Sequence, residues 1–214
     1  MEITWYGHSC FKLSERNLST VVTDPFDKSI GYTLPKLKAD IVTVSHDAPG
    51  HNNVNAVKDA RVINGPGEYE IGGVFITGVA TQRESGDKKK KVEGKNTLYV
   101  FDFDGITVAH LGDLDHVPTQ AQVEEMGNVH VALVPVGGGG GLNSSQAAEV
   151  ISLIEPAIVV PMHYKTEDTN LKLDPLNKFL KEMGLGTVKT EDSLNVKKGN
   201  LPEETHVVVL EYKH

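Results

Sequence analysis

The chain has 214 residues, of which 39% are hydrophobic and 23% charged, and its formal net charge is -8. This length suits one compact α/β domain, spanning residues 1–214, with a core of its own. No apolar run approaches the roughly 20 residues that cross a bilayer, and residues 1–6 lack the basic start of a secretory signal. The acidic balance argues against nucleic-acid binding, which needs a basic surface. We therefore expect a cytoplasmic protein that acts on a small-molecule substrate or ligand, with no membrane and no nucleic-acid partner. The oligomeric state stays open.

A single cysteine, Cys10, cannot form an internal disulfide, and it argues against a cysteine-rich zinc module. We expect it to be a small buried apolar residue rather than a reactive thiol. The one basic run, Lys88 to Lys91, lies between short polar segments and is expected to be a solvated loop.

Short β-rich runs dominate the first half of the chain, and helical periodicity is concentrated in the second half. Strands are expected at residues 3–6, 10–13, 20–23, 41–44, 74–77, 97–103, 106–109, 131–136, 158–161 and 207–212. Helices are expected at about residues 118–126, 144–154 and 175–183, with Asn143 and Asp174 as N-caps. Helices therefore separate the later strands.

The glycines from Gly137 to Gly141 form the only low-complexity segment. A phosphate-binding loop would end in Gly-Lys-Ser or Gly-Lys-Thr, but Leu142 and Asn143 follow here. We expect instead a strand-to-helix turn whose backbone passes close to another element.

Histidine and aspartate residues follow many of the expected strands. Loops at strand ends usually carry the chemistry of layered α/β proteins, and imidazole nitrogen and carboxylate oxygen are ligands that zinc favours. So many such placements together favour a metal site over unrelated hydrogen-bonding residues. The residues are His8, Asp24, His46, His51, Asp113, Asp115, His116 and His163.

A Ser-His-Asp hydrolase is the competing chemistry for these residues. It needs a nucleophile on a tight turn, and the chain contains no Gly-x-Ser-x-Gly motif. Ser9 and Ser45 each adjoin a histidine, but neighbours on an extended segment point to opposite faces. Direct pairing of these serines with the adjacent histidines is therefore not expected.

Several short segments occur in an order typical of one family. They are residues 5–11 (WYGHSCF), 23–26 (TDPF), 45–53, 65–69 (GPGEY), 96–99 (NTLY), 110–114 (HLGDL) and 161–164 (PMHY). In these segments the chain resembles the metallo-β-lactamase superfamily, and it is similar to the small stand-alone Zn-dependent hydrolases of the L-ascorbate-6-phosphate lactonase group. The resemblance covers nearly the whole chain. It implies an αββα sandwich, in which two mixed sheets pack face to face with helices on the outer faces.

The metal loop of that superfamily reads His-x-His-x-Asp-His and serves two adjacent metals. The corresponding segment here keeps the outer histidines, but Ala48 and Gly50 replace the second histidine and the aspartate. A further ligand histidine is expected within residues 78–84, where Arg83 stands near its place. Asp113 corresponds to the bridging carboxylate. The resemblance therefore implies four remaining ligands for zinc, enough in number for one ion: His46, His51, Asp113 and His163.

In the complete site of this family, metal lowers the pKa of a bound water to about 7 and polarises the substrate for hydrolysis of an ester, lactone or phosphoester. The resemblance places Asp113 and His163 at the catalytic centre. The motif aspartate helps to hold or deprotonate the water, which Gly50 cannot do. Two hypotheses follow: a metal-dependent hydrolase with a reduced site that holds one zinc ion or none, or a catalytically silent binding or regulatory protein.

Two further expectations concern residues around this site. His8, Asp24, His110 and His116 are expected near the pocket as groups that orient the ligands, with ordinary hydrogen bonding at strand ends as the alternative. Arg83 is expected to take the place and charge of a lost metal by pairing with Asp113. The alternative is a surface pair with Glu84 or Asp87.

Overall fold

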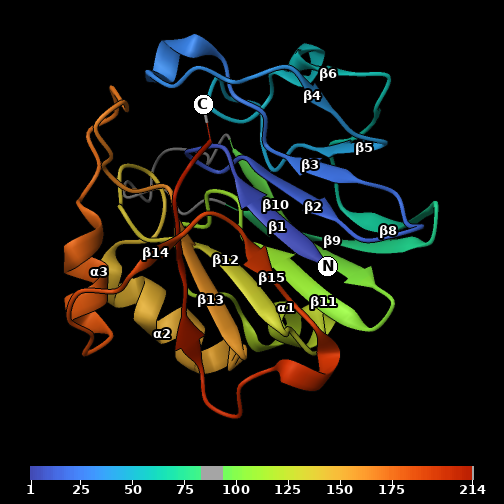
Figure 1. Cartoon of the computed structure of the whole chain (residues 1–214). Coiled ribbons are helices and arrows are strands. Elements are labelled where there is room, and N and C mark those ends of the chain that lie inside the picture. The colour runs from blue at the N-terminus through green and yellow to red at the C-terminus, as the bar shows by residue number, and fades with distance from the viewer. Residues whose placement is uncertain (83–93, 214) are drawn as a thin grey trace.

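The computed structural model describes residues 1–82 and 94–213, and two β-sheets stacked on each other form its centre (Figure 1). The strands of the first sheet are β1 (Glu2–Trp5), β2 (Phe11–Ser14), β3 (Val21–Thr23), β5 (Ile41–Thr43), β7 (Arg61–Ile63) and β15 (Leu194–Asn195). They lie in the order β15-β1-β2-β3-β5-β7. This sheet is mixed, because β1, β2 and β3 pair antiparallel while β3, β5 and β7 pair parallel.

The second sheet is also mixed. Its strands are β8 (Gly67–Ile71), β9 (Val74–Gln82), β10 (Lys95–Phe103), β11 (Ile106–His110), β12 (Val131–Pro135), β13 (Ile158–Met162) and β16 (His206–Val207). They lie in the order β16-β13-β12-β11-β10-β9-β8. The strands from β8 to β11 pair antiparallel, and those from β11 to β16 pair parallel.

Three α-helices pack on the side of the second sheet. They are α1 (Gln120–Met126), α2 (Ser144–Ile154) and α3 (Leu176–Glu182). Helix α1 contacts β9, α2 contacts β12, and α3 packs against α2 (Figure 1). None of the helices in the described residues is long and apolar enough to cross a bilayer. The layered arrangement of helices and two mixed sheets confirms the predicted fold class.

The remaining elements are short. Two small parallel pairs join β4 (Leu37–Lys38) with β6 (Val57–Lys58) and β14 (Thr190–Glu191) with β17 (Val209–Leu210). Single turns of 3₁₀ helix occur at Lys28–Ile30, Val54–Ala56 and Lys198–Asn200.

Successive side chains of a strand point to opposite faces of the sheet, and the first sheet is buried on both faces. Leu13, Val21 and Ile41 belong to the large core cluster that also contains residues of the second sheet. Val22 and Val42, which point the other way, belong to a second cluster beneath the loops between β3 and β7. Cys10 is wholly buried in this second cluster, as predicted. Burial of each large aliphatic side chain contributes about 1.5–3 kcal/mol, so the two faces fix the sheet firmly.

Several predicted elements differ from the structure. Residues 207–212 form no single strand: β16 and β17 pair with strands of different sheets, with Val208 between them. Strand β8 was missed because its sequence, GEYEI, contains residues of low strand propensity and lies at the sheet edge. Strand β9 continues past residue 77 because it pairs with β10 along its whole length.

The helix caps are only partly as predicted. Asn143 caps α2 in a reciprocal capping box, as expected. Asp174 does not cap α3, because Pro175 holds the N-cap position and Asp174 pairs with Lys178 instead (2.6 Å). Helix α1 begins at Gln120 rather than at residue 118, since Thr119 forms its own capping box.

Candidate metal centre

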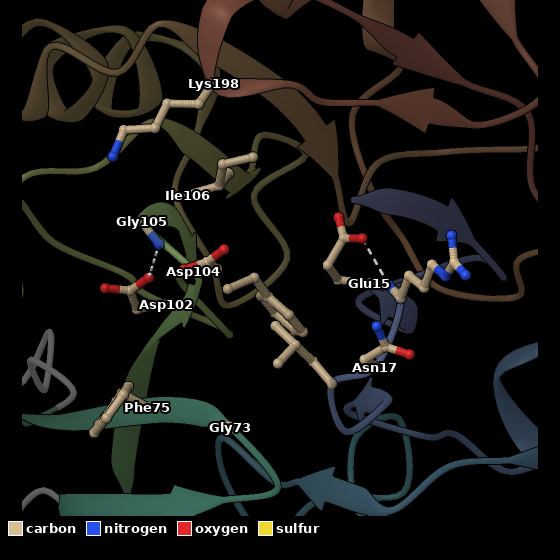
Figure 2. Close-up of a pocket in the computed structure, with 12 residues that line it drawn as sticks. Glu15, Asn17, Gly73, Phe75, Asp102, Asp104, Gly105, Ile106 and Lys198 are labelled. Carbon is tan, nitrogen blue, oxygen red and sulfur yellow. Dashed lines mark hydrogen bonds between the residues drawn. The ribbon is translucent and has the colours of Figure 1, made fainter.

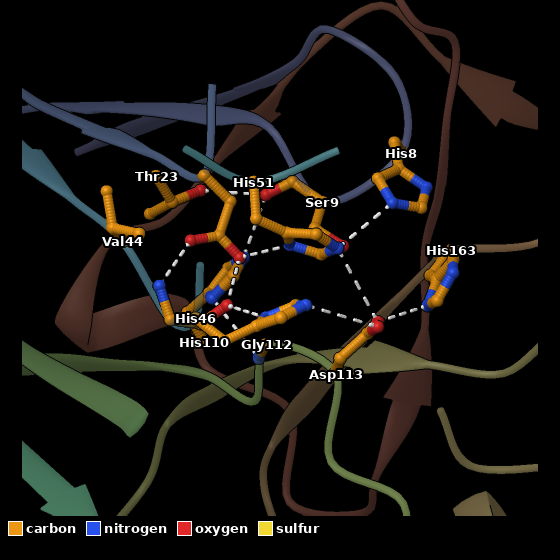
Figure 3. A network of polar contacts seen from close by, with 12 residues as sticks. His8, Ser9, Thr23, Val44, His46, His51, His110, Gly112, Asp113 and His163 are labelled. Carbon is orange, nitrogen blue, oxygen red and sulfur yellow. Dashed lines mark hydrogen bonds and ion pairs between the residues drawn. The ribbon is translucent and has the colours of Figure 1, made fainter. Parts of the chain in front are cut away.

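Histidine and aspartate side chains from both sheets meet at one edge of the sandwich (Figure 3). His46 and His51 follow β5, and Asp113 follows β11. One ligand atom from each of these three residues lies within 4.8 Å of the other two, an arrangement that could hold a metal ion. His163 follows β13, so the ends of parallel strands from both sheets supply the cluster.

The carboxylate of Asp113 stands at the centre of the cluster. Its Oδ2 lies 3.7 Å from Nε2 of His46. Its Oδ1 lies 3.7 Å from Nε2 of His51 and 2.6 Å from Nδ1 of His163. The structure therefore brings together all four ligands that the resemblance implies, and it divides them between the two oxygens of Asp113.

Asp24 fixes the orientation of both histidines of the metal loop. Nδ1 of His51 donates to Asp24 Oδ2 (2.7 Å), and the Ser45 hydroxyl donates to the same oxygen (2.6 Å). Nδ1 of His46 lies 3.1 Å from that hydroxyl and, because the hydroxyl hydrogen goes to Asp24, Nδ1–H donates to the hydroxyl oxygen. Each Nδ1 thus carries the hydrogen, so each Nε2 presents a lone pair toward Asp113. Metal-binding histidines are usually held in this way, and the donor set therefore fits a metal ion.

The contact between Ser45 and His46 corrects one sequence-based expectation. The two neighbours were expected to point to opposite faces of an extended segment. Residues 45–46 instead form a bend directly after β5, and this bend turns both side chains toward Asp24. Because the Ser45 hydroxyl already donates to Asp24, it serves to position His46 and not as an activated nucleophile.

The two buried carboxylates are both held in the ionised form. Burial raises the pKa of Asp24, but the electrostatic influence of His51 and His110 and the hydrogen bonds from His51 and Ser45 outweigh it and lower that pKa below its usual value. Burial likewise raises the pKa of Asp113, whereas His163 and His51 bring it well below the usual range. Ionised oxygen is the form that binds a cation.

His8, between β1 and β2, lies inside the cluster and not merely beside it. Its Nε2 is 3.1 Å from Nε2 of His51, and its ring centroid is 4.3 Å from that of His163. Burial, and then the neighbouring His163 and His51, lowers the pKa of His8 well below its usual value. The ring is therefore neutral at neutral pH.

Of the other predicted neighbours, Asp24 and His110 lie beside the cluster, as expected. His110 is wholly buried, donates from Nε2 to the carbonyl of Ser9 (2.8 Å) and accepts from the backbone of Gly112 (3.3 Å). It therefore joins the His8 segment to the Asp113 loop. His116 pairs with Asp115 (2.7 Å), and no interaction in the described residues links its ring to the four ligands.

Asn96, the buried second residue of β10, begins one of the family segments, but no role was predicted for it. Its Oδ1 accepts from the backbone N–H of Asp113 (2.9 Å), and its Nδ2 lies 3.2 Å from the carbonyl of Leu111. Asn96 thus fixes the loop that carries the central carboxylate. The one signal in the sequence was its place in the family segment NTLY, directly before the strand predicted at residues 97–103.

Local backbone conformation places three of the side chains. His8, Asp24 and His163 all have positive φ angles, of 49°, 39° and 52°. Such conformations are uncommon outside glycine and gather at functional sites. The glycine run lies directly against this region, since a side chain on Gly137 would overlap the carbonyl oxygen of His163. The close approach predicted for the glycine run is thereby confirmed.

Residues 83–93 lie outside the described part of the chain, and they include Arg83 and the basic run from Lys88 to Lys91. The pairing of Arg83 with Asp113, its surface alternative and the solvated loop at the lysines therefore stay predictions.

Two surface hollows differ in their relation to the cluster. The larger, of about 770 Å³, lies at the opposite ends of the strands, between the β2–β3 loop near Glu15 and the turn from Asp102 to Gly105 (Figure 2). None of the metal-ligand candidates lines it. A second hollow of about 360 Å³ lies beside His46 and is lined by three valines, two asparagines and Asp47. This smaller hollow is the one placed to present a molecule to the cluster.

Comparisons with known proteins agree with this geometry. Residues 2–163 match the model of the beta-lactamase superfamily domain. A UPF0173 protein of Pyrococcus furiosus is 30% identical over 203 residues, covering 86% of this chain and 90% of that protein. A UPF0173 metal-dependent hydrolase of Thermoplasma acidophilum is 28% identical over 202 residues, covering 82% and 88%.

Among solved structures, a crystal structure from Thermotoga maritima is similar along the whole chain. That protein, named as a candidate Zn-dependent hydrolase of the metallo-β-lactamase superfamily, is 41% identical, covers 99% of both chains and has a TM-score of 0.81. Sequence, fold and site therefore agree, and the chain belongs to the metallo-β-lactamase superfamily.

Proposed function

We propose that this protein is a metal-dependent hydrolase that holds one zinc ion and cleaves a small ester or lactone. The observation that carries the proposal is the convergence of His46, His51 and Asp113, whose ligand atoms lie within 4.8 Å of one another. The names of the relatives support the hydrolase class. His163, whose Nδ1 is 2.6 Å from Asp113 Oδ1, would complete the ligand set.

A bound zinc ion would supply a water of lowered pKa and polarise the carbonyl oxygen of the substrate. The residues of the chain hold the groups around it in place. Asp24 keeps the hydrogen of His51 on Nδ1, and Ser45 does the same for His46. Asp113, which is ionised and at the centre of the cluster, would hold the ion together with these histidines.

The hollow beside His46 suggests the chemical class of the substrate. At about 360 Å³ it suits a small molecule, and Val44, Val54 and Val62 give it an apolar wall. Its described lining carries the carboxylate of Asp47 and no lysine or arginine side chain. A negative wall disfavours an anionic phosphate group, so an uncharged ester or lactone is preferred to a phosphoester.

The test combines metal analysis with a hydrolysis screen. We expect about one zinc ion per purified chain, and turnover of uncharged esters or lactones at a higher kcat/KM than that of phosphoesters of similar size. Asp113→Asn should abolish turnover, whereas Asp104→Asn, an exposed turn substitution at the far end of the sandwich, should leave it unchanged. A zinc-loaded protein that turns over none of these compounds would favour the catalytically silent alternative.

A further inference from the structure

The side-chain space next to Gly50 is occupied by the imidazole of His8. A Cβ atom placed on Gly50 would lie 2.9 Å from Nε2 of His8 and 3.2 Å from its Cδ2. Both distances are shorter than ordinary van der Waals contact, so a side chain at Gly50 and the ring of His8 exclude each other. Gly50 is the position at which the family motif carries its aspartate.

The ring of His8 lies on one side of Asp113 only. On the Oδ1 side are His51 and His163, and His8 contacts both of them. On the Oδ2 side lies His46. The ring of His8 therefore fills the space beside His51 that a side chain at position 50 would need.

Because the ring of His8 occupies the space that a side chain at position 50 would need, we infer that His8 is a metal ligand. It supplies the donor that Gly50 cannot. The inference rests on the metal site of the proposed function but not on hydrolysis. On the Oδ1 side His8 would join His51, His163 and Asp113 as a further imidazole donor, a ligand type that zinc favours. Two nitrogens bound to one tetrahedral zinc ion lie about 3.3 Å apart, since each bond is about 2.0 Å. The 3.1 Å between Nε2 of His8 and Nε2 of His51 fits that requirement.

The backbone holds His8 in this position without help from its ring. Its carbonyl accepts from Nε1 of Trp5 (3.0 Å) and from the backbone N–H of His163 (3.2 Å). The next carbonyl, of Ser9, accepts from His110 and from the hydroxyl of Thr23. The ring is thus aimed into the cluster before any ion binds, which reduces the entropy lost on binding.

The alternative interpretation of the 3.1 Å contact between the two Nε2 atoms is a direct hydrogen bond from His8 to His51. Nε2 of His51 presents a lone pair, so Nε2–H of His8 could donate to it. In that case His8 would only position a ligand. The two roles differ in the number of imidazoles bound to the ion and in the response to an aspartate at Gly50.

The experiment removes the imidazole of His8 and introduces the family aspartate at position 50, separately and together. Zinc affinity is measured by chelator competition for the full chain and for His8→Ala, Gly50→Asp and the double variant, with His116→Ala as a matched histidine control. X-ray absorption of the zinc-loaded proteins counts the bound imidazoles. Thermal unfolding reports whether each variant is folded.

We expect His8→Ala to weaken zinc binding by at least 100-fold and to remove one imidazole from the zinc shell. Gly50→Asp should weaken binding while His8 is present, because the two side chains overlap, but should strengthen it at least 10-fold in the His8→Ala background. This reversal of sign is not expected of a residue that only supports the structure. His116→Ala should bind zinc within about twofold of the parent chain.

Two results would overturn the inference: an unchanged number of imidazoles in folded His8→Ala, or weaker binding on Gly50→Asp in both backgrounds. Should the parent chain bind zinc through His8 yet hydrolyse nothing, the inference stands and the proposed function fails. If the parent chain binds no zinc, both fail.

Discussion

Asp24 and His51 are 27 residues apart in sequence, yet Oδ2 of Asp24 accepts from Nδ1 of His51 at 2.7 Å. The same oxygen accepts from the hydroxyl of Ser45, which in turn accepts from His46. One buried carboxylate therefore determines which nitrogen of each histidine faces Asp113.

Replacement of Asp24 by Asn should weaken zinc binding about 10- to 100-fold, the usual effect of losing a group that orients ligands. The backbone N–H of Ser45 donates to Oδ1 of Asp24, while His51 and the Ser45 hydroxyl donate to Oδ2. An amide has one acceptor oxygen, so it cannot serve both sides as the carboxylate does. Chelator competition measures the effect. Asp104→Asn, in an exposed turn, is the control. Equal zinc affinities for the two variants would contradict the role given to Asp24.

Removal of metal should lower the thermal stability of the protein. A ligand that binds only the folded chain and is present at 100 times its Kd stabilises it by about 2.7 kcal/mol. For a chain of this size that corresponds to a fall in Tm of about 5–10 °C. Calorimetry with zinc and after dialysis against a chelator checks this, and coincident transitions would show that the cluster holds no metal.

Asn96→Ala should destabilise the fold and weaken zinc binding together. The substitution leaves the buried N–H of Asp113 without its partner, at about 1–3 kcal/mol, while the carbonyl of Leu111 keeps its bond from the N–H of Leu114. Urea unfolding and chelator competition measure the two effects. Asn128→Ala, on the surface, should change neither by a comparable amount. A stability loss with unaltered zinc affinity would mean that Asn96 supports the strand but not the site.

Asn143 and Asp174, the two residues predicted as helix caps, should differ in how much their replacement lowers stability. Asn143→Ala removes a capping box from α2 and should cost about 1 kcal/mol. Asp174→Ala removes one exposed ion pair and should cost less than about 0.5 kcal/mol. Denaturant midpoints of the two variants distinguish them, and a reversed order would restore Asp174 as the cap of α3.

The sequence could predict the layers and the ligands for a simple physical reason. Buried strands are rich in Val and Ile, and a polar residue just after such a run stands out, as His163 does after residues 158–162. The order of the short family segments then indicated which of these residues belong together, and His46, His51 and Asp113 do converge.

The parts that sequence could not predict depend on contacts between distant residues or on local bends. The ring of His8 meets the space at Gly50 only once the loops of β1 and β5 have packed together. The bend after β5, which pairs Ser45 with His46, leaves no periodic signal. Strand β8 has weak intrinsic propensity and exists because β9 pairs with it.

The positive φ angles at His8, Asp24 and His163 imply a conflict between robustness and function. Each such conformation costs on the order of 1–3 kcal/mol for a residue other than glycine, and the packed sheets must offset that cost. Replacement of any of the three residues by glycine would remove that conformational cost. A selection for thermal tolerance alone, carried out without metal, should therefore enrich glycine at these positions and yield sturdier proteins that have lost their chemistry.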